Sequence, residues 1–434
     1  MLAIWRVWKS SKHCSGVNDM AEQHEKALVP QIRFTGFTDP WEQRKLGELA
    51  SKRIEKNTNG IKETFTNSAE HGVVSQLDYF DHDITNDANI GNYSVVHPDD
   101  FIYNPRISAV APCGPINRNK LDRNGVMSPL YTVFSVDDTI DKLYLEHYFK
   151  TSRWHQFMFL EGNSGARSDR FSISDSIFFE MPIQCPVLEE QELIASFFGR
   201  LDSLITLHQR KYDKLCVLKK SMLDKMFPKG GSLYPEIRFA GFTDPWEQRK
   251  LEDYVVVSTA KNVDGRFNKE DVLSVSGEYG IVNQIAFQGR SFAGSSVLNY
   301  GIVNTGDIVY TKSPLNSNPY GIIKVNKGIP GIVSTLYAVY RPQDNVHTNF
   351  IQVYFEQHER MNNYMHPLVN KGAKNDMKVT AENALKGVVT FPSREEQVII
   401  SEFFDRLDSL ITLHQRKLEL LRNIKKSMLD EMFV

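Results

Sequence analysis

The sequence has few cysteines, no excess of charge of either sign and no long apolar run. None of its uninterrupted apolar stretches approaches the roughly 18 residues of a membrane-spanning helix. The four cysteines (Cys14, Cys113, Cys185 and Cys216) form no C-x-x-C pair, which indicates reduced thiols in a cytoplasmic protein and argues against a disulfide framework or a zinc site. Lys and Arg total 51 against 53 Asp and Glu, so only local basic patches could bind nucleic acid. The length of 434 residues predicts two or three domains.

Motifs typical of nucleotide and cofactor sites are also absent. There is no G-x-x-x-x-G-K-[ST] and no G-x-G-x-x-G. The strings Asn104-Pro105-Arg106 and Asn318-Pro319-Tyr320 lack the second proline of the Asn/Asp-Pro-Pro-aromatic motif of amino-methyltransferases. Asp81-His82-Asp83 has no second cluster of ligands, which favours a solvated loop over a metal site. We therefore expect no catalytic residue, metal or cofactor in this chain.

A long internal repeat dominates what the sequence does contain. Residues 30–46 (PQIRFTGFTDPWEQRKL) return as residues 235–251 with two differences in 17 positions. Residues 197–211 (FFGRLDSLITLHQRK) return as residues 403–417 with one difference. The offsets of 205 and 206 residues far exceed the roughly 20 to 50 residues of a solenoid repeat. The repeat therefore predicts a duplicated module, each copy made of a domain and a helix.

Apolar residues recur three or four apart from Glu189 to Met226 and again in the second copy. This spacing predicts two amphipathic helices of about 38 residues, which we expect to pair in antiparallel fashion. Ser393 is suited to cap the second helix. His208 and His414 lie on or near the expected seam, where we expect them to set register and not to bind metal.

The repeated Asp-Pro-Trp-Glu string predicts a short helix in each copy, because Asp at the N-cap, Pro at the first helical position and Glu at the third form a capping box. It begins at Asp39 and Asp244. The segments between the repeated blocks match only weakly. Short apolar runs such as Ser94–Val96, Asp100–Tyr103 and Gly331–Ser334, punctuated by Gly, Asn and Pro, predict strands there. Helices are expected over Leu143–Phe149 and Phe350–Phe355.

Basic and amide side chains gather in loops of these variable segments. Arg and Lys can reach guanine edges and phosphates, and Asn can pair with adenine, so such loops are candidates for DNA contact. The candidates in the first half are Asn104, Arg106, Asn117, Arg118, Lys120, Arg123, Arg167 and Arg170. Those in the second half are Lys312, Ser313, Asn316, Asn318, Lys371, Lys374 and Lys378. The same stretches also hold Asn119, Lys324 and Lys327, and solvated loops are the alternative for most single members.

The aromatic residues of the repeated block, Phe34, Phe37 and Trp41, could stack on bases. Their identity in both copies favours packing within a shared framework.

The order of these blocks resembles the specificity (S) subunit of Type I restriction–modification systems. The I-R-F-x-G-F-T-D-P-W-E-Q-R-K-L block, the P-x-x-E-E-Q helix entry and the F-F-x-R-L-D-S-L-I-T-L-H-Q-R-K helices carry the resemblance over residues 30–433. It implies an α+β fold in which two mixed α/β target-recognition domains are separated by two long antiparallel, coiled-coil-like helices, internally duplicated with pseudo-twofold symmetry. The implied segments are an N-terminal extension (1–29), target-recognition domain 1 (30–186), a first spacer helix (187–227), a linker (228–234), target-recognition domain 2 (235–392) and a second spacer helix (393–434).

The resemblance also implies a function. The chain would be the non-catalytic subunit that reads a bipartite site in double-stranded DNA, one domain per half-site. Two modification subunits, which bind S-adenosylmethionine, would methylate adenine N6, and restriction subunits would use ATP and Mg²⁺ to translocate and cleave DNA. Two other readings stay open: a non-catalytic two-arm scaffold that binds proteins, and a self-contained DNA-modifying enzyme, which the missing motifs disfavour.

Overall fold

The structure is a computed structural model that describes residues 6–7, 28–80, 87–164, 169–312, 318–371 and 377–434. It divides into two compact units. Unit 1 comprises residues 1–208 with 417–434, and unit 2 comprises residues 209–416. Each unit therefore contains one variable segment and a half of each long helix, α7 (Leu188–Lys225) and α11 (Arg394–Met432). The linear domain limits expected from the repeat stay a prediction.

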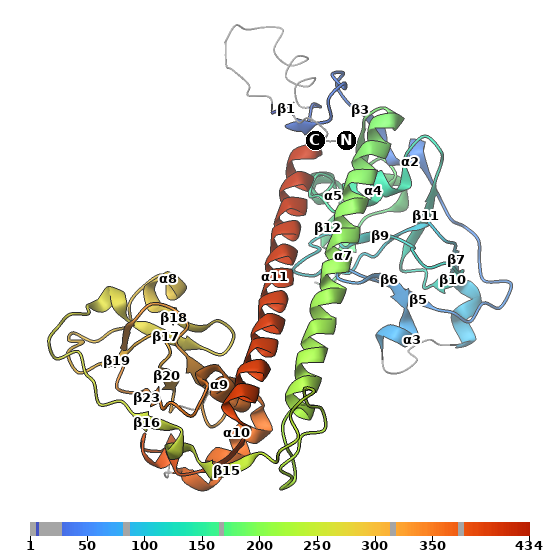
Figure 1. The fold of residues 1–434 in the computed structure, drawn as a ribbon. Coiled ribbons are helices and arrows are strands. Elements are labelled where there is room, and N and C mark those ends of the chain that lie inside the picture. The colour runs from blue at the N-terminus through green and yellow to red at the C-terminus, as the bar shows by residue number, and fades with distance from the viewer. Residues whose placement is uncertain (1–5, 8–27, 81–86, 165–168, 313–317, 372–376) are drawn as a thin grey trace, which may run out of the picture. The chain divides into compact units, whose positions relative to one another are not determined.

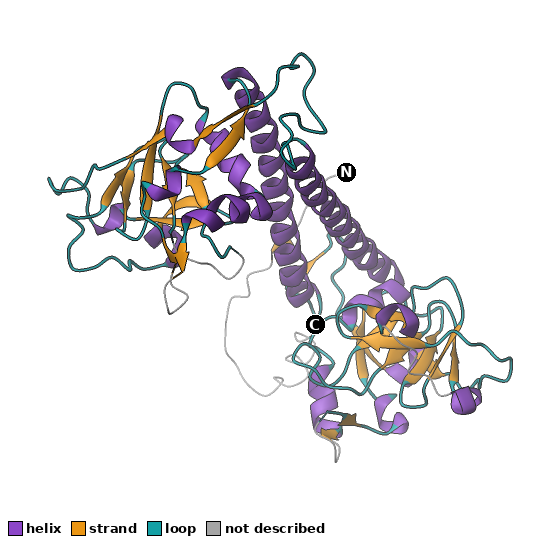
Figure 2. Cartoon of the chain, turned by 90° about the horizontal axis from the view of Figure 1, so that it is seen from below, coloured by secondary structure: helices purple, strands orange, loops and turns teal. Residues whose placement is uncertain are grey.

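Unit 1 mixes short strands with short helices (Figure 2). Its strands are β1 (Arg6–Val7), β2 (Ile32–Arg33), β3 (Glu42–Lys45), β4 (Ala50–Lys52), β5 (Phe65–Ser68), β6 (Gly72–Ser75), β7 (Ser94–Val96), β8 (Phe101–Tyr103), β9 (Ile116–Arg118), β10 (Gly125–Met127), β11 (Thr132–Val136), β12 (Asn163–Ser164), β13 (Phe171–Ser172) and β14 (Pro182–Cys185). Its short helices are α2 (Leu46–Leu49), α3 (Gln76–Tyr79), η1 (Asp87–Asn92), α4 (Lys142–Tyr148), α5 (His155–Glu161) and α6 (Asp175–Phe178).

Unit 2 also mixes short strands with short helices. Its strands are β15 (Glu247–Lys250), β16 (Val255–Val257), β17 (Leu273–Ser276), β18 (Gly280–Asn283), β19 (Gly301–Val303), β20 (Ile308–Tyr310), β21 (Ile323–Val325), β22 (Gly331–Val333), β23 (Ala338–Pro342), β24 (Asn370–Lys371), β25 (Met377–Lys378) and β26 (Val388–Phe391). Its short helices are η2 (Leu251–Asp253), η3 (Lys269–Asp271), α8 (Gln284–Gln288), α9 (Thr348–Glu356), α10 (His358–Met365), η4 (His366–Leu368) and η5 (Asn383–Leu385).

The two units share one strand topology. Unit 1 holds a four-stranded antiparallel sheet in the order β4-β11-β8-β9, with the pairs β7-β10, β5-β6, β3-β14 and β12-β13 beside it. Unit 2 repeats this arrangement as β16-β23-β20-β21, with β19-β22, β17-β18, β15-β26 and β24-β25. The predicted strands over 94–96, 101–103 and 331–333 are therefore confirmed, as are the helices that became α4 and α9. Duplication of one mixed α and β fold accounts for the repeat in the sequence.

In unit 1, the first half of α7 lies antiparallel to the last turns of α11 (Figure 1). The ring of Phe433, which directly follows α11, lies 5.8 Å from the ring of Phe198 in α7. One turn later along α7, Asp202 accepts a hydrogen bond from the Nζ of Lys425 at 2.5 Å. Because the numbers rise along one helix and fall along the other, the two segments run in opposite directions. This pairing buries part of the apolar stripe that the sequence predicted: Ile194 and Leu201 are buried, whereas Leu204 is 44% exposed.

Unit 2 repeats this pairing with the equivalent residues. The rings of Phe227 and Phe404 lie 6.2 Å apart, and the Nζ of Lys219 lies 2.6 Å from an oxygen of Asp408. The positions match those of unit 1 at the 206-residue offset of the repeat. Within each unit the predicted antiparallel arrangement of the helices is therefore confirmed.

The repeated Asp-Pro-Trp-Glu string does not begin a helix, so this prediction was wrong. Glu42 is the first residue of β3, which pairs with β14, and the first helical turn begins only at Leu46. The same holds for Glu247, which begins β15 and pairs with β26. The reason is tertiary. Trp41 is 2% exposed, and its burial together with strand pairing outweighs a local capping preference worth about 1 kcal/mol.

Among the described helices, none is both long and apolar enough to cross a membrane. The described residues also contain no group of three or more His, Cys, Asp or Glu side chains placed to hold a metal ion. Asp81-His82-Asp83 lies outside the described residues.

Candidate nucleic-acid interface

The repeated block and the helix entry meet in a buried ion pair. In unit 1 the guanidinium of Arg33 donates two hydrogen bonds, of 2.7 and 2.8 Å, to the carboxylate of Glu190 near the start of α7. In unit 2 Arg238 donates two bonds of 2.8 Å to Glu396 near the start of α11. Both glutamates are at most 1% exposed. The identity of these positions in the two copies therefore has a structural cause, since an unpaired buried carboxylate would be costly.

The aromatic residues of the repeated block also serve the framework. The Trp41 ring makes edge contacts with Tyr144 at 6.1 Å and with Phe433 at 6.3 Å. Phe34 makes an edge contact with Phe197 at 6.4 Å. The prediction that this segment packs within the framework is confirmed for these two residues.

An asparagine clamps two loops together in each unit, and the sequence reasoning missed it. Asn57 donates to the carbonyls of Ile61 and Ile90 at 2.8 and 3.3 Å and accepts from the Ile61 N–H at 2.8 Å. Asn262 makes the same set of bonds in unit 2 and is fully buried. The signal was an asparagine at the same place in both halves, 205 residues apart, inside segments that otherwise diverge.

Two candidate DNA contacts in the first half belong to the interior of unit 1. The amide of Asn104 donates to the backbone carbonyl of Asn67 at 2.7 Å, and the amide of Asn117 donates to the side-chain oxygen of Asn67 at 2.6 Å. Asn104 and Asn117 are 8% and 4% exposed. A neighbouring asparagine, Asn119, is fully buried and bonds the carbonyl of His97. These three amides satisfy buried backbone and side-chain groups, which a sequence pattern does not reveal.

Three further candidates pair with carboxylates of their own unit. Arg118 donates to Glu146 at 2.9 Å, Lys120 pairs with the same carboxylate, and Arg123 lies 3.0 Å from Glu63. Burial would raise the pKa of the Glu146 carboxyl, but Lys120 and Arg118 outweigh it and hold that pKa below its usual range. Lys120 and Arg123 still expose about half of their side chains.

The structure brings Arg106 and Arg170 together from distant parts of the sequence. Their backbones form an antiparallel bridge, flanked by bonds from the Ile107 N–H to the Asp169 carbonyl and from the Phe171 N–H to the Pro105 carbonyl. Residues directly opposite on such a ladder project to the same face. Arg106 is exposed, and the Nε of Arg170 has no hydrogen-bond partner within the described part of the chain. Arg167 lies outside the described residues.

The candidates of the second half occupy two loops of unit 2. Lys312 adopts a left-handed backbone (φ 49°), and its Nζ donates to the Thr335 carbonyl at 3.3 Å. Asn318 is half-buried. Lys371 and Lys378 lie on the paired strands β24 and β25. Ser313, Asn316 and Lys374 lie outside the described residues.

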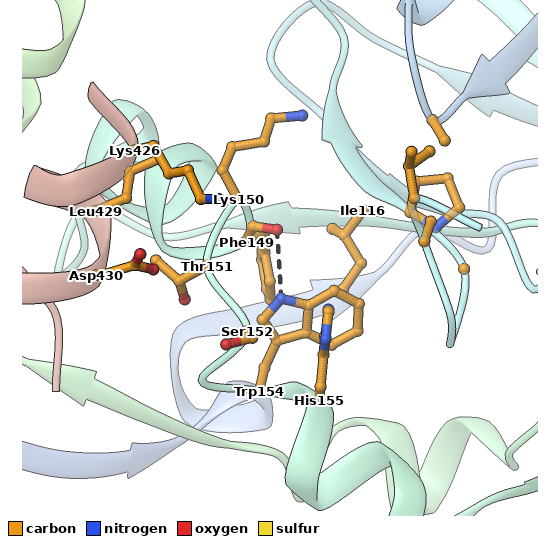
Figure 3. Close-up of a pocket in the computed structure, with 15 residues that line it drawn as sticks. Ile116, Phe149, Lys150, Thr151, Ser152, Trp154, His155, Lys426, Leu429 and Asp430 are labelled. Carbon is orange, nitrogen blue, oxygen red and sulfur yellow. Dashed lines mark hydrogen bonds between the residues drawn. The ribbon is translucent and has the colours of Figure 1, made fainter. Parts of the chain in front are cut away.

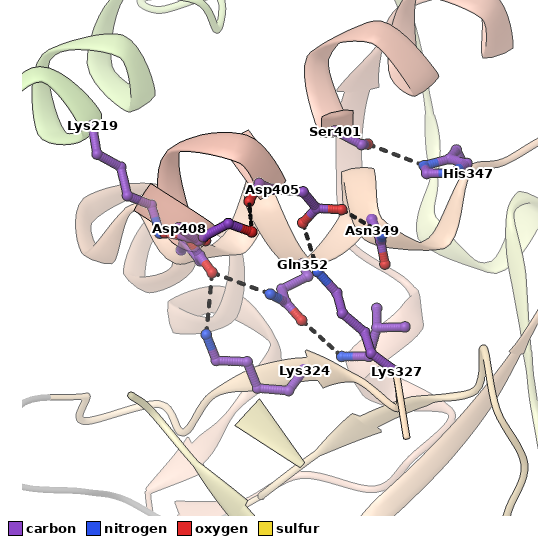
Figure 4. Close-up of polar contacts among 12 residues, drawn as sticks. Lys219, Lys324, Lys327, His347, Asn349, Gln352, Ser401, Asp405 and Asp408 are labelled. Carbon is purple, nitrogen blue, oxygen red and sulfur yellow. Dashed lines mark hydrogen bonds and ion pairs between the residues drawn. The ribbon is translucent and has the colours of Figure 1, made fainter. Parts of the chain in front are cut away.

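Lys324 and Lys327, from the same stretch, join the sheet of unit 2 to its helices (Figure 4). The Nζ of Lys324 lies 3.1 Å from the carboxylate of Glu356, which also lies 2.7 Å from Lys219 of α7. The Nζ of Lys327 lies 2.6 Å from Asp405 of α11. Burial would raise the pKa of Glu356, but Lys324 and Lys219 hold it below the usual range. These two lysines therefore form ion pairs within the fold of unit 2.

Unit 1 has a lysine at the position that corresponds to Glu356, and its buried carboxylate, Glu146, lies four residues earlier. The repeat aligns Lys150 with Glu356, and here the Nζ of Lys150 donates to the side-chain oxygen of Asn117. Beside it lies a cavity of about 300 Å³, lined by Lys150, Trp154 and Lys426 among others (Figure 3). At the matching place in unit 2, Arg360 replaces Trp154, and its guanidinium lies 4.2 Å from the ring centre of Phe227. The two units thus share a frame and fill it with different chemistry.

A curated protein and two solved structures resemble this chain. A curated protein of Methanocaldococcus jannaschii, named as a type I restriction enzyme MjaX specificity subunit, is 22% identical over 306 residues, which cover 66% of this chain and 65% of that protein. The match thus spans just under two thirds of the length of this relative. Among solved structures, the Type-I restriction-modification system S subunit from M. genitalium gives a TM-score of 0.53 at 14% identity, over 94% of this chain and 99% of the other. The HsdS subunit from Thermoanaerobacter tengcongensis gives 0.40 at 16% identity, over 92% and 98%.

The likeness to the M. genitalium structure shows the fold alone. The family itself is shown by sequence: the family described as Type I restriction modification DNA specificity domain matches this chain twice, over residues 38–216 and 243–423. These two matches cover most of the chain and fall one on each copy of the repeat. The chain therefore belongs to the family of Type I restriction modification DNA specificity domains.

Proposed function

We propose that this chain is the DNA-recognition subunit of a Type I restriction–modification complex and reads a bipartite site, one half-site with each unit. The observation that carries the proposal is the contrast between frame and loops. Both units keep the same strand order and the same buried Arg–Glu pair, while their exposed loops carry different side chains. Two unlike half-sites need two unlike reading surfaces on a common support.

The repeated frame supports a partnership with two copies of one protein. Identical positions in both copies offer the same chemistry twice, which fits two modification subunits. These subunits would bind S-adenosylmethionine and methylate adenine N6, for which the base must leave the duplex. Restriction subunits would add ATP- and Mg²⁺-dependent translocation and cleavage. In this scheme the present chain contributes recognition and no catalytic group, and it acts in the cytoplasm, where its DNA is.

The test is a genome-wide map of N6-methyladenine in a host that expresses the modification subunit, with and without this chain. We expect a split motif, two short half-sites around a fixed unspecific gap, that appears only when the chain is present. The control is the same modification subunit with a different specificity subunit, which must give a different motif. Absence of chain-dependent methylation with an active partner would contradict the proposal and favour a protein-binding scaffold.

A further inference from the structure

Two loops of unit 2 form one continuous surface. Asn262 joins them by donating to the carbonyls of Phe267 and Val297, at 2.8 and 3.4 Å. Beneath them lies a small buried core of Val272, Ile302 and Ile332, against which side chains of both loops pack. The loops are residues 260–267, between β16 and η3, and residues 289–298, between α8 and β19. A surface fixed from below in this way can present side chains in a defined arrangement.

This surface exposes apolar side chains beside unpaired arginines. Val263, Phe292 and Leu298 are 73%, 57% and 47% exposed. The guanidinium of Arg290 lies 4.5 Å from the ring centre of Phe292, and that of Arg266 lies 4.9 Å from the ring centre of Phe267. Among the described residues, neither guanidinium pairs with a carboxylate, in contrast to Arg118 and Arg123 of unit 1. Exposed apolar groups with available cations mark a binding surface.

The corresponding part of unit 1 has the opposite charge. Between β18 and β19, residues 284–300 contain Arg290 and no Asp or Glu. Between β6 and β7, residues 76–93 contain four Asp and no Lys or Arg. The asparagine clamp beneath the loops is nevertheless the same, through Asn57. The frame is kept and the presented chemistry differs, so this surface distinguishes one unit from the other.

We propose that this Arg290 surface (Lys261, Val263, Arg266, Arg290, Phe292 and Leu298) contacts DNA, and that Arg290 and Phe292 are specificity-determining residues for the half-site read by unit 2. The inference rests on the proposed function and adds a reading surface that lies outside the candidate loops around 312–318 and 371–378. Arginine can donate two parallel hydrogen bonds to guanine, and an exposed ring can contact a thymine methyl group or wedge against a base step.

DNA fits this surface better than a protein partner that binds both units alike. Such a partner would meet a cationic, apolar surface on unit 2, whereas the matching segment of unit 1, residues 76–93, has an acidic sequence. Two half-sites of different sequence do not require the two units to present similar surfaces. The acidic segment of unit 1 would repel phosphates, so unit 1 must read its own half-site with other residues, of which Arg106 and Arg170 are placed together.

The experiment uses the full chain with its modification subunits and compares wild type with the double variant Arg290→Ala/Phe292→Ala. We expect the methylation motif to keep one half-site unchanged, while the other accepts additional bases, with about tenfold or greater loss of discrimination at one or more positions. Arg290→Lys keeps the charge but not the paired donors, and we expect it to relax the same half-site. The matched control is Ile329→Ala/Lys386→Ala, two exposed residues of unit 2 away from this surface.

Each outcome has a defined meaning. An unchanged motif in both Arg290 variants overturns the inference while leaving the proposed function intact. An unchanged motif together with reduced recovery of the modification subunit overturns it in favour of a protein contact. A wild-type chain that directs no methylation contradicts the proposed function and the inference with it. Circular dichroism and thermal unfolding that match wild type show that a relaxed half-site does not come from misfolding.

Discussion

At the scale of single residues, His147 of unit 1 is buried in surroundings that disfavour a charged ring. Its ring is 1% exposed, neither ring nitrogen has a hydrogen-bond partner among the described residues, and the ring of Phe198 lies 5.0 Å away. Burial, assisted by the nearby charge of Lys425, lowers the pKa of His147 from 6.5 to about 4. The repeat aligns it with Val353, which shows that the frame also accepts an apolar side chain here.

This histidine makes the stability of unit 1 depend on pH. Between about pH 6.5 and pH 4 the unfolded chain binds a proton at His147 that the folded chain does not, so the free energy of unfolding falls as the pH falls, by roughly 3 kcal/mol in total. We expect His147→Val to remove this part of the slope, as measured by urea unfolding across that pH range. Val353→Ala at the matching place of unit 2 serves as control, because it removes no titrating group and should leave the slope unchanged. Equal slopes for wild type and His147→Val would show that the imidazole is not held neutral.

Individual DNA contacts could not be predicted from residue type, for a physical reason. Asn104 and Asn117 look like adenine readers in a loop, yet they satisfy buried groups around Asn67. Arg118 looks available, yet a buried glutamate, Glu146, takes its charge. The same residue types serve hydrogen bonding in the interior and recognition at the surface. Only burial and partners separate the two, and these come from contacts between distant segments.

At the scale of elements, the two units differ in the ion pairs that the short helix, α4 in unit 1 and α9 in unit 2, makes with its neighbours. In unit 2, Glu356 at the end of α9 lies between Lys219 and Lys324, and Asp408 completes the cluster. In unit 1, Lys150 stands at the position of Glu356, and the buried carboxylate of α4, Glu146, pairs with Arg118 and Lys120. Sheet and helices of unit 2 are thus joined by an ion cluster whose members are mostly buried.

This cluster predicts a large cost for a small change. Glu356→Gln leaves Lys324 buried without a carboxylate and leaves Lys219 with Asp408 alone, so we expect a loss of about 3 kcal/mol in the unfolding free energy of unit 2. Urea unfolding followed by a probe in unit 2 measures it. The control is Glu180→Gln, which breaks an exposed pair with Lys45 and should cost little or nothing. Similar losses for both variants would mean that the buried cluster has no special role.

Helices could be predicted from the sequence where the spacing of apolar residues was periodic over a long segment. The two long helices and their antiparallel pairing came from a sustained apolar stripe, which few other structures can satisfy. The capping box at Asp39 misled because it is a local signal of small energy. Strand pairing of Glu42–Lys45 with Pro182–Cys185 overrode it from far along the chain. Likewise, nothing local indicated that Asn57 would clamp two loops.

At the scale of the whole chain, each unit carries its own core and its own copy of the frame. In unit 2 the frame consists of Phe227, Trp246, the Arg238–Glu396 pair and Phe404. All of these residues lie before or after the variable segment in the sequence. The variable segment contributes Phe350 to this core, with its ring 5.7 Å from Phe227. A foreign segment that supplies an equivalent aromatic residue could therefore be seated on the same frame.

The final prediction is that exchanging residues 252–391 for the matching segment of another member of the family changes one half-site only. The reason is that this segment contains the Arg290 surface and the inner strands of unit 2, while unit 1 retains its own core and loops. The donor segment should carry a carboxylate at the position of Glu356, because Lys219 stays in the recipient and would otherwise keep only one of its two carboxylate partners, Asp408. Mapping N6-methyladenine for the hybrid checks the outcome. A change in both half-sites would show that recognition by one unit depends on the other, and that the duplicated frame does not separate them.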